Sequence, residues 1–460
     1  MYKSYIFSAL HAHAAQDNLS AHMPGHKNGT LLPETLKNAW GENVFRYDLT
    51  ELPGLDNLHD PQGIIQKSQE QSAAIFGAQA AHYLINGSSG GLHAALMALA
   101  AGEEIFVPRH CHRSIYHGLM LAEAKAIYLP VTLDEKWGLP LGVALTDLKK
   151  AISAHPSCRN LLIVNPTYQG LSWQNAQLIT YAKEIGLNVI VDEAHGAHFH
   201  FNPALPPSAI DLGADLVVQS WHKTLPALTG SSCLLVGSDY QGRNLTKVIS
   251  ILQSTSPSYL LLSSLEAAAI YLAVDGKEDI AHSLKEIAQF KQDLALLTTI
   301  SYLHNDAWQA DPFKLNLYST VLNGEQLAAK LQNEHIYVEM SEANSCLLLL
   351  PLKFTAAYRQ RLFQALAQIE QATKALPPRA LTKPFYLPTI PQTKYPLKQA
   401  LWQAKEAVNI EEALGRAAAE FMLQYPPGIP LLLPGEIISA EAIDLLRTYP
   451  QYQRLAVLQE

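Results

Sequence analysis

The sequence predicts an α/β protein with a large, mostly parallel sheet followed by a smaller C-terminal α/β domain. Residues 81–237 alternate short apolar runs with amphipathic stretches, which is typical of βαβ units around a buried parallel sheet. The chain has 460 residues, enough for a large core and for two or three domains of about 150 residues each. Hydrophobic residues make up 48% and charged residues 16%, the balance of a globular protein.

The apolar runs of the first half have the length of strands. We predict strands at 82–86, 104–108, 126–130, 160–165, 187–192, 216–220 and 233–237. Helical stretches lie between several of them, notably at 92–101 and 175–185. From 260 to 297, Leu, Ala and Ile recur at steps of three and four residues, which predicts a helical segment.

A second α/β segment starts near residue 301. We predict helices at 324–333 and 356–375 and a strand at 345–350. Six prolines lie between Pro377 and Pro396, which excludes a helix or central strand and predicts an extended connection. A long helix over 397–423 is predicted to follow.

Composition excludes several classes of function. The net charge of 33 − 41 = −8 argues against a nucleic-acid-binding surface. We find no apolar run near the roughly 18–20 residues that a membrane span needs. Four cysteines without paired spacing indicate reduced thiols in a cytosolic protein. The N-terminal run from Tyr5 to Leu10 is shorter than the core of a signal peptide, so we interpret it as the start of the fold.

A Gly/Ser-rich turn follows the strand predicted at 82–86. Its residues are Asn86-Gly87-Ser88-Ser89-Gly90-Gly91, directly before a predicted helix. Glycines let a ligand approach the backbone, hydroxyl groups form hydrogen bonds, and a helix N-terminus favours an anion. The turn therefore indicates a phosphate site, with simple capping of the helix as the alternative. It matches neither the P-loop nor the GxGxxG pattern.

A carboxylate, Asp192, ends the apolar strand predicted at 187–192. An unpaired buried charge is costly, so Asp192 needs a partner such as a protonated heterocyclic nitrogen or a Mg²⁺ ion. His195, His198 and His200 follow and suggest zinc, but alternating histidines on one short segment would not all face one ion. We therefore predict no metal site and place these histidines in solvent or at the edge of the core.

A lysine, Lys223, follows the strand predicted at 216–220, within Ser220-Trp221-His222-Lys223-Thr224. A lysine at a strand end is commonly an ordinary surface charge, but lysine amines also form Schiff bases with carbonyl cofactors. The spacing from Asp192, 223 − 192 = 31 residues, leaves room for a helix and a strand between them. Open α/β sheets bind their ligands at such strand ends.

The loop after the strand at 104–108 carries His112. This histidine either stacks flat on an aromatic cofactor ring or is one of eighteen histidines without a special role. An anion cradle, a strand-end carboxylate and a strand-end lysine together fit pyridoxal phosphate (PLP). The phosphate needs the cradle, the pyridinium nitrogen needs the carboxylate, and the aldehyde needs the lysine.

These residues are part of a larger set of sequence motifs. In these motifs the chain resembles the bacterial ornithine/lysine/arginine decarboxylases, which are fold-type-I PLP enzymes. The motifs that carry the resemblance lie at 22–27, 48–51, 55–56, 86–91, 108–114, 165–168, 192–198, 220–224, 254–256 and 425–436. They are spread in order over nearly the whole chain. The length resembles the compact form of the family, without the N-terminal wing domain of the larger enzymes.

The resemblance implies roles for individual residues. Lys223 is expected to hold PLP as a Schiff base with His222 beside it, and Asp192 to bond the pyridine nitrogen. Ala194 and His112 are expected to pack on opposite faces of the ring. The remaining expected contacts to the cofactor come from Ser88, Ser89, Gly90 and Ser220 at the phosphate and from His195.

The resemblance also implies how the chain is organised. The expected parts are an N-terminal segment at 1–60 that contributes to the active-site and dimer region, a large PLP-binding domain at 61–297, and a C-terminal α/β domain at 298–460 with a Pro-rich connection at 377–396. Ser254 or Thr255 is expected to reach the phosphate of the neighbouring subunit, which implies a homodimer or an assembly of dimers. The alternative is that 254–257 only caps the following helix.

The implied reaction is decarboxylation of a basic L-amino acid, arginine, lysine or ornithine, to CO₂ and agmatine, cadaverine or putrescine. This implies a cytoplasmic enzyme of polyamine biosynthesis. The sequence departs from the family at Gly230, where a Gln is usual after Thr229, and this bears on the pocket and on substrate preference. Two rivals are an aminotransferase or aldolase, for which Arg109 and Arg113 are available to grip a carboxylate, and a non-catalytic homologue with a regulatory role.

Overall fold

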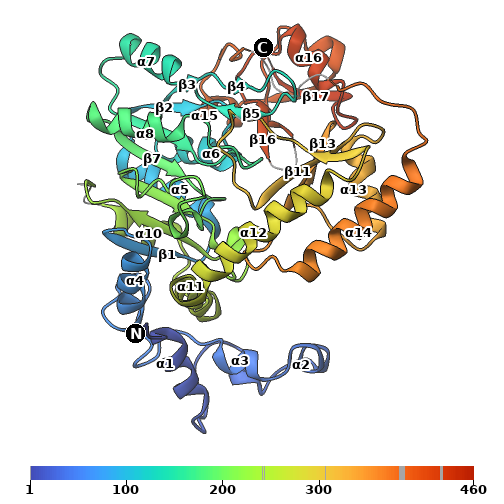
Figure 1. Cartoon of the computed structure of the whole chain (residues 1–460). Helices are drawn as coiled ribbons and strands as arrows, with labels where there is room; N and C mark the ends of the chain where they lie inside the picture. The colour runs from blue at the N-terminus through green and yellow to red at the C-terminus, as the bar shows by residue number, and fades with distance from the viewer. Residues whose placement is uncertain are drawn as a thin grey trace. The chain divides into compact units, whose positions relative to one another are not determined.

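The computed structural model describes residues 2–459 apart from 241, 243, 306, 383–388 and 425–427. The chain forms two compact units, each assembled from segments that are distant in sequence (Figure 1). The first unit comprises Met1–Ala101, Ile179–Leu284 and Pro351–Lys353, and the second unit comprises Gly102–Leu178, Lys285–Leu350 and Phe354–Glu460. This division differs from the predicted parts 1–60, 61–297 and 298–460, which remain a prediction.

Four strands of a mixed sheet lie in the first unit. In spatial order they are β1 (Ala80–Leu84), β9 (Ser232–Val236), β8 (Leu216–Gln219) and β7 (Asn188–Asp192). β7 and β8 run parallel, whereas β9 runs antiparallel to both β1 and β8. The strands lie close to the predicted positions, but the reversed direction of β9 departs from a purely parallel sheet.

The Gly/Ser-rich turn is the first turn of α5 (Gly87–Leu99), so this helix begins earlier than the predicted residue 92. Glycine and serine are weaker helix formers than alanine or leucine, which is why the sequence alone leaves them outside the helix. Packing decides the outcome, because α5 contacts β7 and β8. A Cβ added at Gly91 would lie 2.5 Å from Leu84 Cδ1, so only glycine permits this close approach.

Seven further α-helices lie wholly within the described part of the first unit. They are α1 (Tyr5–Ala14), α2 (Glu34–Trp40), α3 (Asn43–Tyr47), α4 (Ile64–Ile75), α9 (Trp221–Thr224), α10 (Leu245–Leu252) and α11 (Tyr259–Tyr271). Of these, α4 packs on β1 and α9 on β9. The N-terminal run belongs to the fold, as predicted, since Ile6 and Leu10 of α1 are fully buried. The Glu266 carboxylate of α11 accepts a hydrogen bond from the backbone N–H of Ile6 at 3.0 Å.

One helical stretch, Tyr259–Leu294, passes a length and composition test for a membrane span, which the sequence did not predict. It consists of α11, a π-helical turn (Leu272–Gly276) and α12 (Lys277–Leu294). Of its most apolar window, 44% is buried inside the protein, and core helices pass the same test. Leu262 and Leu265 of α11 are fully buried, so its apolar side packs within the fold.

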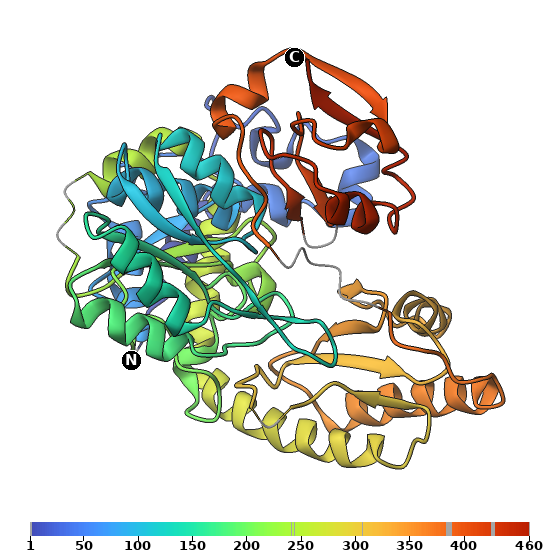
Figure 2. The same cartoon turned by 90° about the horizontal axis from the view of Figure 1, so that it is seen from above.

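The second unit contains three parallel strands and a separate antiparallel sheet. The parallel strands are β6 (Asn160–Val164), β2 (Glu104–Pro108) and β3 (Lys125–Leu129), in that order. The antiparallel sheet has the order β10 (Ile300–Tyr302), β11 (Lys314–Ser319), β13 (Ser345–Leu349) and β12 (Met340–Ser341). α13 (Gly324–Asn333) packs on β11 and β13 and contacts α14 (Ala356–Thr373) (Figure 2). These helices and β13 confirm the predicted elements at 324–333, 356–375 and 345–350.

The remaining α-helices of the second unit are α6 (Arg113–Leu121), α7 (Leu145–Ala154), α15 (Leu397–Trp402) and α16 (Ala440–Leu446). Two helices, α8 (Asn175–Glu184) and α12, have residues in both units. The helix predicted at 175–185 corresponds to α8. The four cysteines, Cys111, Cys158, Cys233 and Cys346, are buried, and no disulfide bond joins any two of them.

The long helix predicted over 397–423 is wrong. The only α-helix there is α15, which is followed by β14 (Lys405–Asn409), a short 3₁₀ helix (Ile410–Ala413) and later β15 (Met422–Gln424). β14 pairs antiparallel with β17 (Arg454–Leu458), and β15 with β16 (Ile429–Leu432). The Ala- and Glu-rich stretch has good local helix propensity, but pairing with a distant strand overrides it. Gly415, at φ +76°, turns the chain between the two strands.

The Pro-rich connection at 377–396 contains no helix in its described part, and a single bridge, from Thr393 to Glu436, is its only strand-like pairing there. Residues 383–388, with Pro384 and Pro388, lie outside the described residues. The same holds for 425–427, the beginning of the family motif at 425–436.

Candidate active site

Asp192 is the last residue of β7 and is only 6% exposed. Its Oδ1 accepts a hydrogen bond from the backbone N–H of Ala194 at 3.1 Å. Burial raises the pKa of Asp192, and the positive charge of Lys223 offsets this rise only in part. The carboxylate therefore lies where its ionised form needs a further cationic partner.

Lys223 lies in the short helix α9, directly after β8, with Ser220 as the N-cap residue. Its Nζ lies 3.3 Å from Nε2 of His195. The effect of its charge on Asp192 places these side chains in one neighbourhood. The structure thus brings Asp192, His195 and Lys223 together from the ends of two adjacent parallel strands.

His222 turns away from Lys223 toward the strand that follows. Its Nδ1–H donates to the carbonyl oxygen of Ser231 at 2.9 Å, and its backbone N–H donates to the same oxygen at 3.1 Å. Burial lowers the pKa of His222, the Ser231 carbonyl opposes this shift, and Lys223 adds to it. The imidazole is therefore neutral near pH 7 and fixed in orientation.

The first turn of α5 offers an anion cradle in the same unit. Ser88 and Ser89 are half-buried there, and Gly90 is buried. The N–H groups of a helix's first turn have no partner within the helix and carry partial positive charge. The backbone N–H of Gly87 donates to the carbonyl of Gly230 at 2.9 Å, so the following N–H groups are the ones directed at a ligand.

One buried hydroxyl in the same unit lacks a hydrogen-bond partner. Ser220 is fully buried, and its Oγ has no hydrogen-bond partner within the described part of the chain. A buried polar group without a partner is costly unless a ligand or water satisfies it. Ser220 and the first turn of α5 are both donors, which is the chemistry that a phosphate requires.

Ser254 and Thr255 lie on an exposed loop between α10 and α11. The carbonyl of Ser254 accepts a hydrogen bond from His59 Nε2 at 2.7 Å. The cap of α11 is Ser258, whose Oγ accepts from the backbone N–H of Leu261. The alternative that 254–257 caps this helix is therefore wrong, and Ser254 and Thr255 are exposed residues in the single chain.

His112 belongs to the second unit, where it is the N-cap residue of α6. Its Nδ1 accepts from the backbone N–H of Ser114 at 3.2 Å and lies 2.8 Å from Ser114 Oγ. The ring is half-buried and held in one orientation by these contacts. Its expected place against the cofactor ring remains a prediction.

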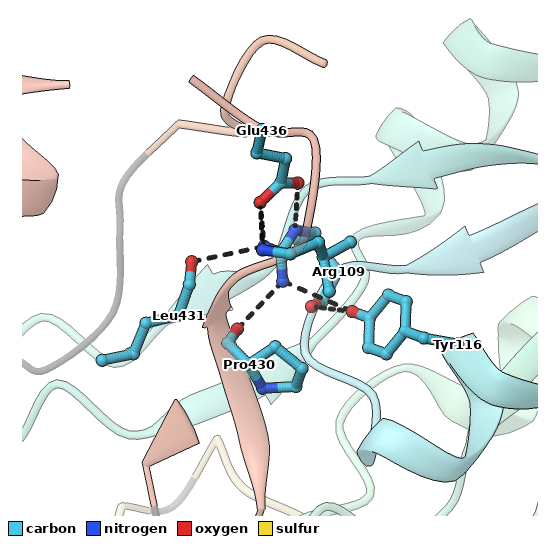
Figure 3. Close-up of polar contacts among 6 residues, drawn as sticks. Arg109, Tyr116, Pro430, Leu431 and Glu436 are labelled. Carbon is cyan, nitrogen blue, oxygen red and sulfur yellow. Dashed lines mark hydrogen bonds and ion pairs between the residues drawn. The ribbon is translucent and has the colours of Figure 1, made fainter. Parts of the chain in front are cut away.

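Arg109 has a role that the sequence did not reveal. Its guanidinium is bound to the Glu436 carboxylate, at 3.2 Å from Nε and 2.7 Å from Nη2, and to the carbonyls of Pro430 and Leu431 (Figure 3). Arg109 is 9% exposed. It is therefore not available to grip a substrate carboxylate, which removes one residue on which the aminotransferase hypothesis relied.

The histidines that suggested zinc have separate partners. His195 contacts Lys223, whereas His200 Nδ1 lies 2.8 Å from Asp211 Oδ1. His198 packs its ring edge-on against Phe199. Among the described residues, no group of three or more His, Cys, Asp or Glu side chains is arranged to hold a metal ion.

Comparison with known proteins decides the family. Residues 4–317 match the family described as Orn/Lys/Arg decarboxylase, major domain, and residues 387–455 match its C-terminal domain. The chain belongs to the Orn/Lys/Arg decarboxylase family. The resemblance inferred from the motifs is thereby confirmed. Members of this family are PLP-dependent carboxy-lyases, so the chain is an enzyme that decarboxylates a basic amino acid.

Several relatives match nearly the whole of this chain. The uncharacterised protein YaaO of Bacillus subtilis is 35% identical over 450 residues, which are 96% of this chain and 93% of YaaO. The arginine decarboxylase of Halalkalibacterium halodurans is 32% identical over 96% of this chain and 92% of its own length. The inducible lysine decarboxylase of Escherichia coli is 22% identical, and the match spans 76% of its length.

Solved structures establish the fold type. The E. coli constitutive lysine decarboxylase superposes with a TM-score of 0.84 at 20% identity, over 99% of this chain and 82% of that chain. The serine palmitoyltransferase of Sphingomonas wittichii superposes with a TM-score of 0.57 at 16% identity, over 75% of this chain and 83% of that chain. The predicted fold-type-I architecture is therefore confirmed.

Proposed function

We propose that this enzyme is an arginine decarboxylase that uses PLP to convert L-arginine to agmatine and CO₂. One structural observation carries the proposal: Asp192, His195 and Lys223 meet in the unit that also holds the first turn of α5 and the unpartnered hydroxyl of Ser220. The choice of arginine rests on relatives named arginine decarboxylase, at 32–33% identity over 92% or more of their length. The lysine decarboxylases are only 22–24% identical.

The residues present fit PLP at both ends. We assign the phosphate to Ser88, Ser89, Gly90 and Ser220, because these offer donors at a helix N-terminus and one buried hydroxyl. We assign the ring nitrogen to Asp192 and the aldehyde to Lys223. When bound, PLP supplies an electron sink that accepts the electron pair released as the carboxylate leaves as CO₂.

Asp192 keeps the ring nitrogen protonated. A protonated pyridine nitrogen is the cationic partner that the buried carboxylate otherwise lacks, and the pairing offsets the burial that raises the pKa of Asp192. Because Asp192 accepts a hydrogen bond from Ala194, its Oδ1 is held in place, and Ala194 follows as a small contact for one ring face.

We assign His195 and His222 to the surroundings of the Lys223 amine, each with a different role. His195 Nε2 lies close enough to Lys223 Nζ to exchange a proton with it, which a lysine must lose before it acts as a nucleophile. His222 is fixed by Ser231 and stays neutral, so it adds no positive charge beside the amine. His112 is assigned to the ring face opposite Ala194.

The complete site draws on two chains. Ser254 and Thr255 are exposed in the single chain, as a pair of hydroxyl groups must be to reach the phosphate of a partner subunit. We therefore propose a homodimer or an assembly of dimers, with residues 1–60 contributing to the region of the active site and the interface. Four buried cysteines that form no disulfide bond fit a reducing cytoplasm, where the amine product feeds polyamine biosynthesis.

Product analysis by mass spectrometry tests the proposal. Purified protein with PLP is offered arginine, lysine and ornithine in separate reactions. Agmatine as the dominant product supports the assignment. Cadaverine or putrescine as the dominant product overturns the choice of arginine but keeps the decarboxylase, whereas transfer of the amino group to a keto acid supports the aminotransferase rival.

A further inference from the structure

The polar cluster around Arg109 has no part in the reaction as assigned so far. It is a buried ion pair, and Arg109 precedes the site residue His112 by three residues. The side chains of Arg109 and Glu436 are 10% and 1% exposed. The guanidinium makes four hydrogen bonds to the segment 430–436, two to the Glu436 carboxylate and two to backbone carbonyls (Figure 3). A planar guanidinium bonded on several sides has only one orientation available to it.

Each partner is also fixed from its own side. Glu436 Oε2 accepts from the backbone N–H of Leu433 at 2.7 Å, and the Glu436 carbonyl accepts from Ala418 N–H at 2.8 Å. The backbone N–H of Arg109 donates to Leu129 of β3 at 3.0 Å, and the Tyr116 hydroxyl donates to the Arg109 carbonyl at 2.6 Å. The pair therefore joins two rigid pieces of the second unit.

The same segment, 428–436, also contacts the chain on the C-terminal side of His112. The backbone N–H of Arg113 donates to the carbonyl of Gly428 at 3.1 Å. His112 lies between Arg109 and Arg113, so the chain is held by 428–436 on both sides of it. Between these contacts Cys111 is buried, and its Sγ donates to the Pro108 carbonyl at 2.8 Å. Little freedom remains for the backbone that carries the His112 ring.

We propose that Arg109 and Glu436 are positioning residues that fix His112 for its contact with the cofactor ring. In this way residues 428–436, which lie within the family's C-terminal domain match at 387–455, take part in cofactor binding without touching the cofactor. The inference rests on the proposed place of His112. Apolar residues of equal volume can stabilise a core as well as a buried ion pair does, so directional fixing is what this pair adds.

The experiment compares two ion-paired carboxylates of the second unit, the buried Glu436 and the half-buried Glu286. Glu436→Gln removes the charge that orients Arg109, and Glu286→Gln removes a charge from the pair that joins Arg359 of α14 to α12 at 2.9 Å. The dissociation constant of PLP for each apoenzyme is measured by equilibrium dialysis, together with kcat and KM. His112→Ala serves as the reference for loss of the ring contact.

We expect Glu436→Gln to reproduce His112→Ala, with a PLP dissociation constant raised about tenfold, because a lost contact between two stacked rings costs up to about 1.5 kcal/mol and about 1.4 kcal/mol is tenfold in affinity. The control Glu286→Gln should stay within about twofold of the wild type. Native PLP affinity in a folded Glu436→Gln enzyme overturns the proposal. If His112→Ala also binds PLP normally, the assigned place of His112 fails as well, while Lys223 and the product analysis stand independently.

A second variant tests the proposal if Glu436→Gln does not fold. The double variant Arg109→Met/Glu436→Leu removes both charges and keeps the apolar volume, so it leaves no buried charge without a partner. If it is folded by circular dichroism, weak PLP binding supports the proposal. PLP binding equal to that of the wild type overturns it.

Discussion

Asp192 is buried, and nothing in the described part of its own chain balances its charge fully, because Lys223 only partly offsets the effect of burial on its pKa. The ring nitrogen of PLP is the balancing charge in our account. The two groups depend on each other, since the carboxylate keeps the nitrogen protonated and the nitrogen keeps the carboxylate ionised.

Asp192→Asn should therefore leave PLP bound but slow decarboxylation by several orders of magnitude. Without the ion pair the ring nitrogen loses its proton, and a neutral pyridine withdraws electrons poorly. Each pKa unit corresponds to about 1.4 kcal/mol and each such step to about tenfold in rate. Single-turnover kinetics with saturating arginine measures the effect, and near-normal turnover would mean that the carboxylate serves another group.

His110 adds a pH dependence of stability in the second unit. Burial lowers its pKa to about 4 from 6.5, so the folded protein keeps it neutral while the unfolded chain binds a proton. The contribution of neutral His110 to the free energy of unfolding is therefore complete above pH 6.5 and is lost as the pH falls toward 4. The loss should reach about 2 kcal/mol by pH 5.

His110→Phe removes this loss without breaking a hydrogen bond, because neither ring nitrogen has a partner among the described residues. We expect the urea midpoint of the wild type to fall more steeply between pH 7 and pH 5 than that of the variant. Parallel curves for the two proteins would show that His110 does not carry the effect.

At the scale of the element, the first turn of α5 depends on the turn before β9. Gly230 has φ +94°, in the left-handed region that favours glycine, and its carbonyl receives the N–H of Gly87. A glutamine at this position would be strained in this conformation. We therefore expect Gly230 to affect the first turn of α5 rather than Lys223.

Gly230→Gln should lower the free energy of unfolding by about 1–3 kcal/mol and weaken PLP binding, because relief of the strain moves the carbonyl that holds α5. The control is Gly213→Gln, at φ +84° with open space around its Cβ position, which carries similar strain away from the cradle. Thermal unfolding and PLP titration separate the two effects. Equal loss of PLP affinity in both variants would refute a role for Gly230 in the cradle.

The local sequence pattern was sufficient to predict most helices and strands between residues 81 and 237, because the buried strands there are continuous apolar runs bounded by loops. It failed at 397–423, where Ala and Glu favour helix locally but β14 pairs with a strand near the end of the chain. The motif residues Asp192 and Lys223 were identifiable from their places at strand ends. The contact between Glu436 and Arg109 could not be predicted, because the two residues are 327 positions apart in the sequence and no local signal links them.

At the scale of the whole molecule, the account requires that each active site uses two chains. Lys223→Ala removes the amine from one site, and the double variant Ser254→Ala/Thr255→Ala removes the hydroxyl groups offered to the partner. Each variant alone should be inactive or nearly so. In a mixed dimer, one site receives an intact Lys223 and intact partner hydroxyl groups.

Mixing the two variants should restore about a quarter of the wild-type activity, since half of randomly mixed dimers are heterodimers with one competent site each. Native mass spectrometry verifies that the subunits have exchanged. A mixture that stays inactive after exchange would refute the shared site.

The central claim is that Lys223 is the residue that binds PLP covalently, and borohydride reduction followed by peptide mapping tests it most directly. Reduction fixes the cofactor to whichever amine holds it, and proteolysis with mass spectrometry locates the label. We predict the pyridoxyl group on Lys223, and no label with an intact fold in Lys223→Ala. A label on any other lysine, or none in the PLP-loaded wild type, would contradict the account.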